Sequence, residues 1–135
     1  MRYLLDASAI YRAIETKRKD LIEDAITLDL ARYEVGNAIL KDVMIHKRMD
    51  LQKAQQVMEF INELFENIEI VTEAQGDDVI KTASFLGVSF YDAAYVSYAK
   101  RTGLVFVTED VKLSKKIKSY IEHISIEALP ANKII

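Results

Sequence analysis

The chain has 135 residues, 50% of them hydrophobic and 29% charged, which is ordinary for a globular protein and predicts a single domain over residues 1–135. A net charge of -3 argues against nucleic-acid binding through a broad basic face, and the lack of cysteine excludes disulfides and thiolate metal sites. No apolar run is as long as a membrane span, and we expect a cytoplasmic protein without a signal peptide.

The first predicted strand ends at an acidic residue. Tyr3-Leu4-Leu5 is a short apolar run, Asp6 stops it, and a helix-like segment from Ala9 to Glu15 follows. This pattern predicts a buried parallel strand that leads directly into a helix, with Asp6 at the carboxyl end of the strand. Ligands bind at that edge of open parallel sheets. The alternative is that Asp6 is only a helix N-cap, a position that aspartate fills well.

The middle of the chain alternates strand and helix patterns after a basic turn at residues 17–19. We expect strands over residues 25–29 and 68–71, and helices over residues 30–47, 51–67 and 73–86. The first two helices should form an antiparallel hairpin. Glu34 lies on or beside an apolar helix stripe, where a lone buried carboxylate is costly. It either reaches water, Arg32 or Lys41 at the rim, or points over the sheet edge towards Asp6.

The last third predicts a helix, a central strand, a lysine-rich helix and an edge strand. Ser89 and Asp92 fit a capping box, and Gly103 closes the helix that they begin. Three tyrosines share one face of that helix and form either core packing or a subunit interface, namely Tyr91, Tyr95 and Tyr98. Residues 104–107 predict a buried strand that ends near Asp110, which repeats the arrangement of Asp6. Residues 124–126 predict an edge strand.

Alternation of strands and helices predicts an α/β fold with a mostly parallel sheet, whose strands all end at one edge. Asp6 and Asp110 follow strands, while Glu34 and Asp92 lie near the starts of helices that face the same edge. Carboxylates gathered without a cation raise each other's pKa, and Mg²⁺ or Mn²⁺ relieves this repulsion. With no cysteine and two histidines, zinc is disfavoured. Hard metal ions in an acidic pocket favour phosphate chemistry, and no glycine-rich phosphate loop is present.

Four short motifs occur in order along nearly the whole chain. They are Leu4-Leu5-Asp6-Ala7-Ser8, Tyr33-Glu34-Val35-Gly36-Asn37-Ala38, Tyr91-Asp92-Ala93-Ala94-Tyr95 and Val107-Thr108-Glu109-Asp110. Together they resemble the motifs of PIN domains, and most of all those of the VapC toxins of toxin–antitoxin modules. The resemblance implies a three-layer α/β/α sandwich with about five strands and a Mg²⁺- or Mn²⁺-dependent endoribonuclease. Such proteins are usually homodimers that a cognate antitoxin inhibits.

The resemblance also assigns site residues. It places metal-binding and catalytic acids at Asp6, Glu34, Asp92 and Asp110, and supporting polar groups at Ser8, Asn37 and Thr108. Two further functions stay open, a PIN-domain nuclease in RNA processing outside a toxin–antitoxin pair and a non-catalytic acidic Mg²⁺-binding module such as a receiver-like domain. A receiver domain would have a second acid beside Asp6 and a lysine at the end of the last strand. Here Ala7 and Ser8 follow Asp6, and residues 126–128 contain no lysine. A haloacid-dehalogenase-like phosphatase would want aspartate in place of Ser8.

Overall fold

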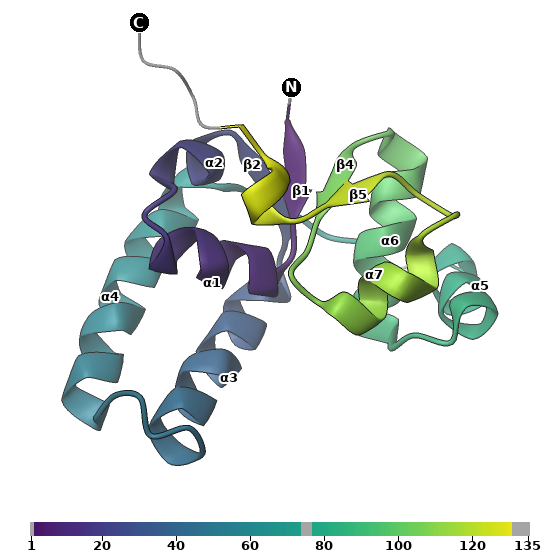
Figure 1. The fold of residues 1–135 in the computed structure, drawn as a ribbon. Helices are drawn as coiled ribbons and strands as arrows, with labels where there is room; N and C mark the ends of the chain where they lie inside the picture. Colours follow the sequence, from purple (N-terminus) through teal and green to yellow (C-terminus); the bar gives the residue numbers. More distant parts are fainter. Residues whose placement is uncertain (1, 74–76, 131–135) are drawn as a thin grey trace, which may run out of the picture.

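Five short parallel strands form a sheet at the centre of the computed structural model, which describes residues 2–73 and 77–130 (Figure 1). In sequence order the strands are β1 (Tyr3–Leu5), β2 (Ala25–Leu28), β3 (Glu69–Val71), β4 (Val105–Val107) and β5 (His123–Ile124). Their order across the sheet is β3-β2-β1-β4-β5, and every adjacent pair is parallel. The predicted α/β fold is therefore confirmed, and the carboxyl ends of all five strands lie at one edge.

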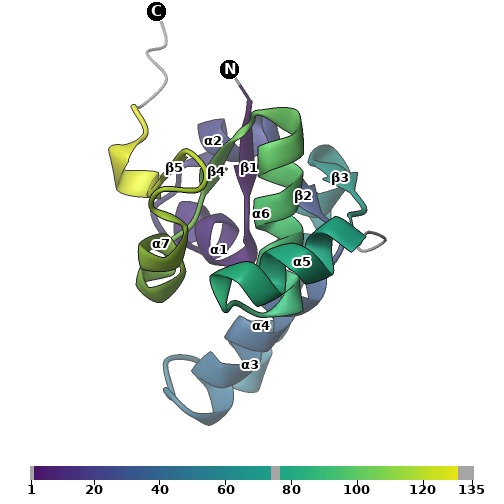
Figure 2. The same cartoon turned by 90° about the vertical axis from the view of Figure 1, so that its right-hand side faces the viewer.

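Helices cover both faces of the sheet. They are α1 (Ala7–Glu15), α2 (Lys19–Glu23), α3 (Ala31–Met44), α4 (Leu51–Asn67), α5 (Asp77–Leu86), α6 (Phe90–Thr102) and α7 (Val111–Ile117). Leu5 packs into a core with α1 to α4, whereas Leu4 packs into a second core with α5, α6 and α7. Successive strand residues point to opposite faces, so this alternation follows from the pleat. Figures 1 and 2 show the resulting three layers.

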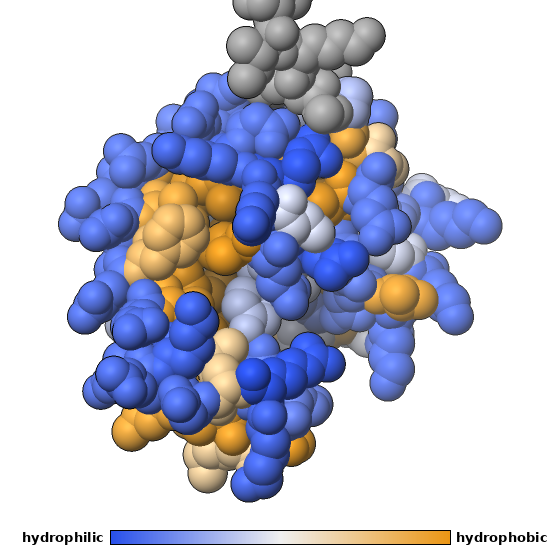
Figure 3. Space-filling model, turned by 60° about the vertical axis from the view of Figure 1, so that its left-hand side comes forward, coloured by the Kyte–Doolittle hydropathy of each residue, from blue (hydrophilic) through white to orange (hydrophobic). Residues whose placement is uncertain are grey.

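Helices α3 and α4 form the predicted antiparallel hairpin, which projects from the sandwich (Figure 1). The hydroxyl of Tyr11 on α1 donates to the buried carboxylate of Asp42 on α3 at 2.5 Å and ties the hairpin to α1. Apolar side chains stay exposed near the end of the hairpin, among them Met44 and Ile45 (Figure 3). Among the described residues no helix is both long enough and apolar enough to cross a bilayer.

Several boundaries differ from the prediction. Helix α2 was not predicted, and it forms because Leu21 and Ile22 bury in the first core. The lysine at position 47, predicted as helical, has a φ of 53° beyond the end of α3. Strand β5 ends at Ile124, not at residue 126, because the amide of Ile126 donates to Glu109 Oε1 at 2.6 Å and begins a 3-10 helix.

Helix α5 begins at Asp77 in the described part of the chain, whereas the prediction began at residue 73. Residues 74–76 of that predicted helix lie outside the described residues. The tyrosine face of α6 is also not continuous at the surface. Tyr91 is exposed, but Tyr95 is buried and stacks on Phe106 of β4 with ring centroids 5.8 Å apart. The interpretation of these tyrosines as one exposed subunit interface is therefore wrong for Tyr95.

Candidate active site

Asp6 lies where β1 passes into α1 and is 6% exposed. Its backbone is extended and its Oδ1 accepts the amide hydrogen of Ala9 at 2.9 Å, so it is the N-cap of α1. Ser8 Oγ donates to the same oxygen at 2.6 Å, and Thr108 Oγ1 donates to Oδ2 at 2.6 Å. Both carboxylate oxygens therefore have fixed positions at the carboxyl edge of the sheet.

The hydroxyls of Ser8 and Thr108 join the ends of β1 and β4. Ser8 Oγ accepts the amide hydrogen of Glu109 at 2.9 Å, and Thr108 Oγ1 accepts that of Asp110 at 3.1 Å. Each hydroxyl thus donates to Asp6 and accepts from the neighbouring loop. Two of the three predicted supporting residues, Ser8 and Thr108, thus orient Asp6 and hold the loop that carries Asp110.

Glu34 lies in the first turn of α3 and is half-buried. The hydroxyl of Tyr95 on α6 donates to Glu34 Oε1 at 3.2 Å. Burial raises the pKa of Glu34 to about 7, the Tyr95 hydrogen bond lowers it, and the charges of Asp6 and Asp92 raise it further. Among the ion pairs of the described residues, none joins Arg32 to Glu34, and the Arg32 guanidinium instead lies 5.0 Å from the centroid of the Phe65 ring. Of the two predicted placements, Glu34 adopts the one that faces Asp6.

Asp92 and Asp110 lie at the starts of α6 and α7. The amide of Asp92 donates to Ser89 Oγ at 3.0 Å, which is the predicted cap, and Asp110 Oδ1 accepts from the amide of Leu113 at 3.0 Å. Burial raises the pKa of Asp92, the charge of Asp110 raises it further, and Ser89 and Lys116 lower it. The lysine was not singled out by the sequence analysis.

The four acids form one electrostatic cluster. Burial raises the pKa of Asp6 to about 6, hydrogen bonds from Ser8, Thr108 and the Ala9 amide oppose this shift, and the charge of Asp92 adds to it. Glu34 interacts with both Asp6 and Asp92, and Asp92 interacts with Asp110. Residues that are far apart in sequence therefore meet at one sheet edge, and their mutual repulsion leaves uncompensated negative charge there.

The donor set of this cluster fits a hydrated divalent cation. Within the described residues, no three acidic or histidine side chains are close enough to hold one ion by direct contact. Mg²⁺ normally keeps several waters and uses only one or two carboxylates, so a looser arrangement of oxygen donors is compatible with it. Both histidines lie elsewhere, His46 after α3 and His123 in β5. One or two of the acids Asp6, Glu34, Asp92 and Asp110 could therefore hold the ion directly, and the others through its bound waters.

Asn37 was predicted to support the site and Tyr95 was not, but the structure shows the opposite for hydrogen bonding to Glu34. Asn37 lines a surface pocket together with Glu34, but no hydrogen bond joins these two described side chains. The hydroxyl of Tyr95, by contrast, reaches Glu34 and was missed as a polar group. Its spacing of three residues from Asp92 places both on the same side of α6, which is the signal that could have found it.

Comparisons with known proteins give a consistent picture. The PIN domain family matches residues 3–118 of the chain. Two relatives from Pyrobaculum aerophilum are each 32% identical. One, Exonuclease VapC9, aligns over 124 residues that make up 90% of each chain. The other, Ribonuclease VapC3, aligns over 133 residues, covering 90% of this chain and 98% of the relative.

Solved structures share the fold. The crystal structure of PAE2754 from Pyrobaculum aerophilum is 30% identical, has a TM-score of 0.77 and matches 94% of this chain and 93% of that chain. VapBC2 from Rickettsia felis, solved bound to a DNA fragment from its promoter, has a TM-score of 0.61 at 15% identity, and the match covers 93% and 98% of the two chains. At that identity the similarity shows the fold alone.

Proposed function

We propose that this chain, which belongs to the PIN domain family, is a divalent-metal-dependent endoribonuclease and the toxin of a toxin–antitoxin pair. The observation that carries the proposal is the acidic cluster at the carboxyl edge of the sheet, where burial and repulsion raise the pKa values of Asp6, Glu34 and Asp92. Nuclease names among its relatives support the same reaction class.

Each acid has a distinct part in the proposal. Asp6 is the fixed ligand, since two hydroxyls and one amide hold its carboxylate. Asp92 and Asp110 lie at the starts of α6 and α7, from which they would help to hold the ion beside Asp6. When bound, Mg²⁺ or Mn²⁺ would neutralise the carboxylates and stabilise the negative charge that develops on the phosphate.

Glu34 is the proposed general base. Its pKa of about 7 suits a group that must be ionised and still accept a proton near neutral pH. In the proposed hydrolysis a water oxygen bonds to phosphorus and gives its proton to Glu34, and the bond from phosphorus to the leaving ribose oxygen breaks. That oxygen takes a proton from solvent, so that the two products are separate strands. Tyr95 keeps Glu34 facing the reaction site through its hydroxyl.

The biological setting is proposed from the relatives. Two relatives carry the VapC name, and the Rickettsia felis and Salmonella typhimurium structures are VapBC assemblies with DNA. A cognate antitoxin, an RNA substrate, a homodimer and a cytoplasmic location are the corresponding proposals for this chain. The exposed apolar residues at the end of the α3–α4 hairpin, such as Met44 and Ile45, are a feature that a protein partner would cover.

Cleavage of a circular single-stranded RNA tests the reaction, because an exonuclease cannot start on a circle. This choice matters since one relative is named an exonuclease. With Mg²⁺ or Mn²⁺ we expect linear products from the wild type, none in EDTA, and a loss of about 10²-fold or more for Asp6→Asn. Lys112→Ala is the control, and it should change the salt dependence rather than the maximal rate. Activity that persists in EDTA, or an Asp6→Asn variant as fast as the wild type, would contradict the mechanism.

A further inference from the structure

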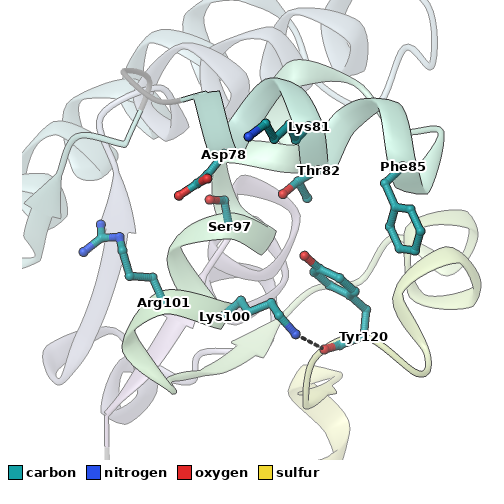
Figure 4. Close-up of a pocket in the computed structure, with 8 residues that line it drawn as sticks. All are labelled: Asp78, Lys81, Thr82, Phe85, Ser97, Lys100, Arg101 and Tyr120. Atoms are coloured by element: carbon teal, nitrogen blue, oxygen red, sulfur yellow. Dashed lines mark hydrogen bonds between the residues drawn. The ribbon is translucent and has the colours of Figure 1, made fainter.

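A second polar pocket lies outside the acidic cluster, between α5, α6 and the turn that follows α7 (Figure 4). Its volume is about 500 Å³, within the range of pockets that hold small molecules. None of the four acids lines it. The catalytic proposal therefore leaves the pocket unexplained.

The floor of this pocket is built from hydroxyl groups. Thr82 of α5 is 7% exposed and Ser97 of α6 is 8% exposed, and both line the pocket. Figure 4 shows the Tyr120 hydroxyl in the same space between the two helices. A hydroxyl both donates and accepts hydrogen bonds, which matches the mixed donors and acceptors on the edge of a nucleobase.

One wall of the pocket is aromatic. Phe85 is 77% exposed and contacts Tyr120, with ring centroids 6.0 Å apart and ring planes at 46°. A phenylalanine this exposed buries little area and so contributes little to folding. Proteins that bind single-stranded nucleic acid stack bases on aromatic rings of this kind beside cationic side chains. The outer face of Phe85 is therefore a candidate platform for a base.

The rim of the pocket is cationic. Lys81 and Lys100 line it, and the ammonium of Lys100 lies 4.2 Å from the centroid of the Tyr120 ring. Arg101 also lines the pocket but pairs with Glu73, and Asp78 adds one acid to the rim. Residues 77–118, which form α5, α6, β4 and α7, contain seven of the 18 Lys and Arg residues and five of the 21 Asp and Glu residues. The elements around the pocket therefore have more basic than acidic residues, whereas the whole chain has a net charge of -3.

A neighbouring pocket connects this surface with the acidic cluster. Phe85 and Tyr120 line both pockets, and Lys115, Lys116 and Lys118 line the second one. Lys116 donates to the Gly87 carbonyl at 2.7 Å and also interacts electrostatically with Asp92. A chain of cations therefore leads from Asp92 to the rim of the hydroxyl-lined pocket, along a path that a sugar-phosphate backbone could follow.

We infer that the pocket between α5 and α6 binds one nucleotide of a single-stranded RNA that flanks the scissile phosphodiester. The base stacks on Phe85 and presents its edge to Thr82 and Ser97, while its phosphates contact Lys81 and the lysines of α7. The choice of RNA as ligand rests on the proposed ribonuclease function. The position of the subsite rests on the pocket, the exposed ring and the lysines that line the two neighbouring pockets.

Fluorescence anisotropy with a labelled 12-nucleotide single-stranded RNA in EDTA tests the subsite, because binding is then measured without cleavage. Loss of one stacked base costs about 1–3 kcal/mol, so Phe85→Ala should raise the Kd about tenfold. Lys81→Gln should lower the slope of log K against log salt by about 0.7, as one lost phosphate contact does. The matched controls are Phe60→Ala and Lys53→Gln, which alter exposed residues of α4 and should leave both quantities unchanged.

Cleavage kinetics of the same variants distinguish this subsite from the catalytic proposal. Phe85→Ala should raise KM about tenfold and leave kcat unchanged, because Phe85 lies outside the acidic cluster. A wild type that cleaves RNA, with Phe85→Ala binding and cleaving equally well, would overturn the subsite and leave the ribonuclease proposal standing. A wild type that neither binds nor cleaves RNA would overturn both. Loss of dimerisation in Phe85→Ala with RNA affinity unchanged would assign the surface to a protein contact and overturn the subsite.

Discussion

Replacing Asp6 with asparagine is expected to stabilise the metal-free protein at neutral pH. The carboxylate of Asp6 is buried, and its burial opposes ionisation more strongly than its three hydrogen bonds favour it. Asparagine has nearly the same shape and carries no charge. Its oxygen can accept from Ser8 and the Ala9 amide, and its amide group can donate to Thr108 Oγ1.

The size of the effect follows from the pKa of Asp6, which burial raises from 3.8 to about 6. One pKa unit corresponds to about 1.4 kcal/mol, so ionised Asp6 destabilises the folded state by about 3 kcal/mol. The side chain is almost fully buried, so solvent screening does not reduce this value much. Against a typical unfolding free energy of 5–15 kcal/mol, about 3 kcal/mol is a large fraction.

The sign and pH window follow from proton linkage. Below pH 3.8 Asp6 is protonated in both states, and its pKa shift has no effect on stability. Between pH 3.8 and about 6 the unfolded chain releases the proton while the folded chain keeps it, so the stability of the wild type falls as the pH rises. Above pH 6 the loss is complete. The advantage of Asp6→Asn should therefore grow from near zero at pH 4 to about 3 kcal/mol at pH 7.5.

Urea unfolding in EDTA at several pH values measures this difference. Asp50→Asn is the matched control, because Asp50 is also a helix N-cap, accepting from the Lys53 amide at 2.8 Å, but is exposed to solvent. Asparagine caps helices as well as aspartate does, so the control should change little at any pH. An Asp6→Asn variant whose difference from the wild type does not vary with pH would refute the assignment of a raised pKa to Asp6.

Two further predictions concern metal binding and Glu34. In thermal unfolding, Mn²⁺ at about 100 times its Kd should stabilise the wild type by about 2.7 kcal/mol, and the Asp6→Asn variant should gain far less. Equal stabilisation of the two proteins would show that Asp6 does not bind the ion. Tyr95→Phe removes the hydroxyl that lowers the pKa of Glu34, so that pKa should rise above about 7. The acidic limb of the pH–rate profile should then move to higher pH, whereas the control Tyr98→Phe should leave it in place. An acidic limb that does not move in Tyr95→Phe would exclude Glu34 as the general base.

Much of the fold could be predicted because the sheet is parallel. A short apolar run followed by an acid and a helix has few other interpretations, and topology then brings the ends of β1 and β4 to one edge. The convergence of Asp6 and Asp110 follows from that rule alone. Glu34 required a choice between two faces, which periodicity cannot make, since its orientation depends on Tyr95 from a helix 61 residues away.

The errors have a common physical cause, which is tertiary contact. Helix α2 is short and depends on burial of Leu21 and Ile22 rather than on a strong local pattern. The end of β5 depends on the carboxylate of Glu109, which takes the amide of Ile126 out of strand geometry. Helical spacing placed Tyr91 and Tyr95 on one face but could not show that only Tyr95 is covered by the sheet. In each case the deciding partner is distant in the sequence.

Helix capping is compatible with the proposed catalytic role of the same acids. Oδ1 of Asp6 accepts a hydrogen bond from the Ala9 amide, and Oδ1 of Asp110 accepts one from the Leu113 amide. Capping fixes the backbone and one oxygen, so the second oxygen of each carboxylate has a defined position without help from a metal ion. Asp50 caps α4 in the same way, but it is exposed to solvent. What distinguishes Asp6 is its burial and the nearby charges of Glu34 and Asp92, which make ionisation costly unless a cation is present. The parallel sheet brings these acids together, and the caps hold them in place.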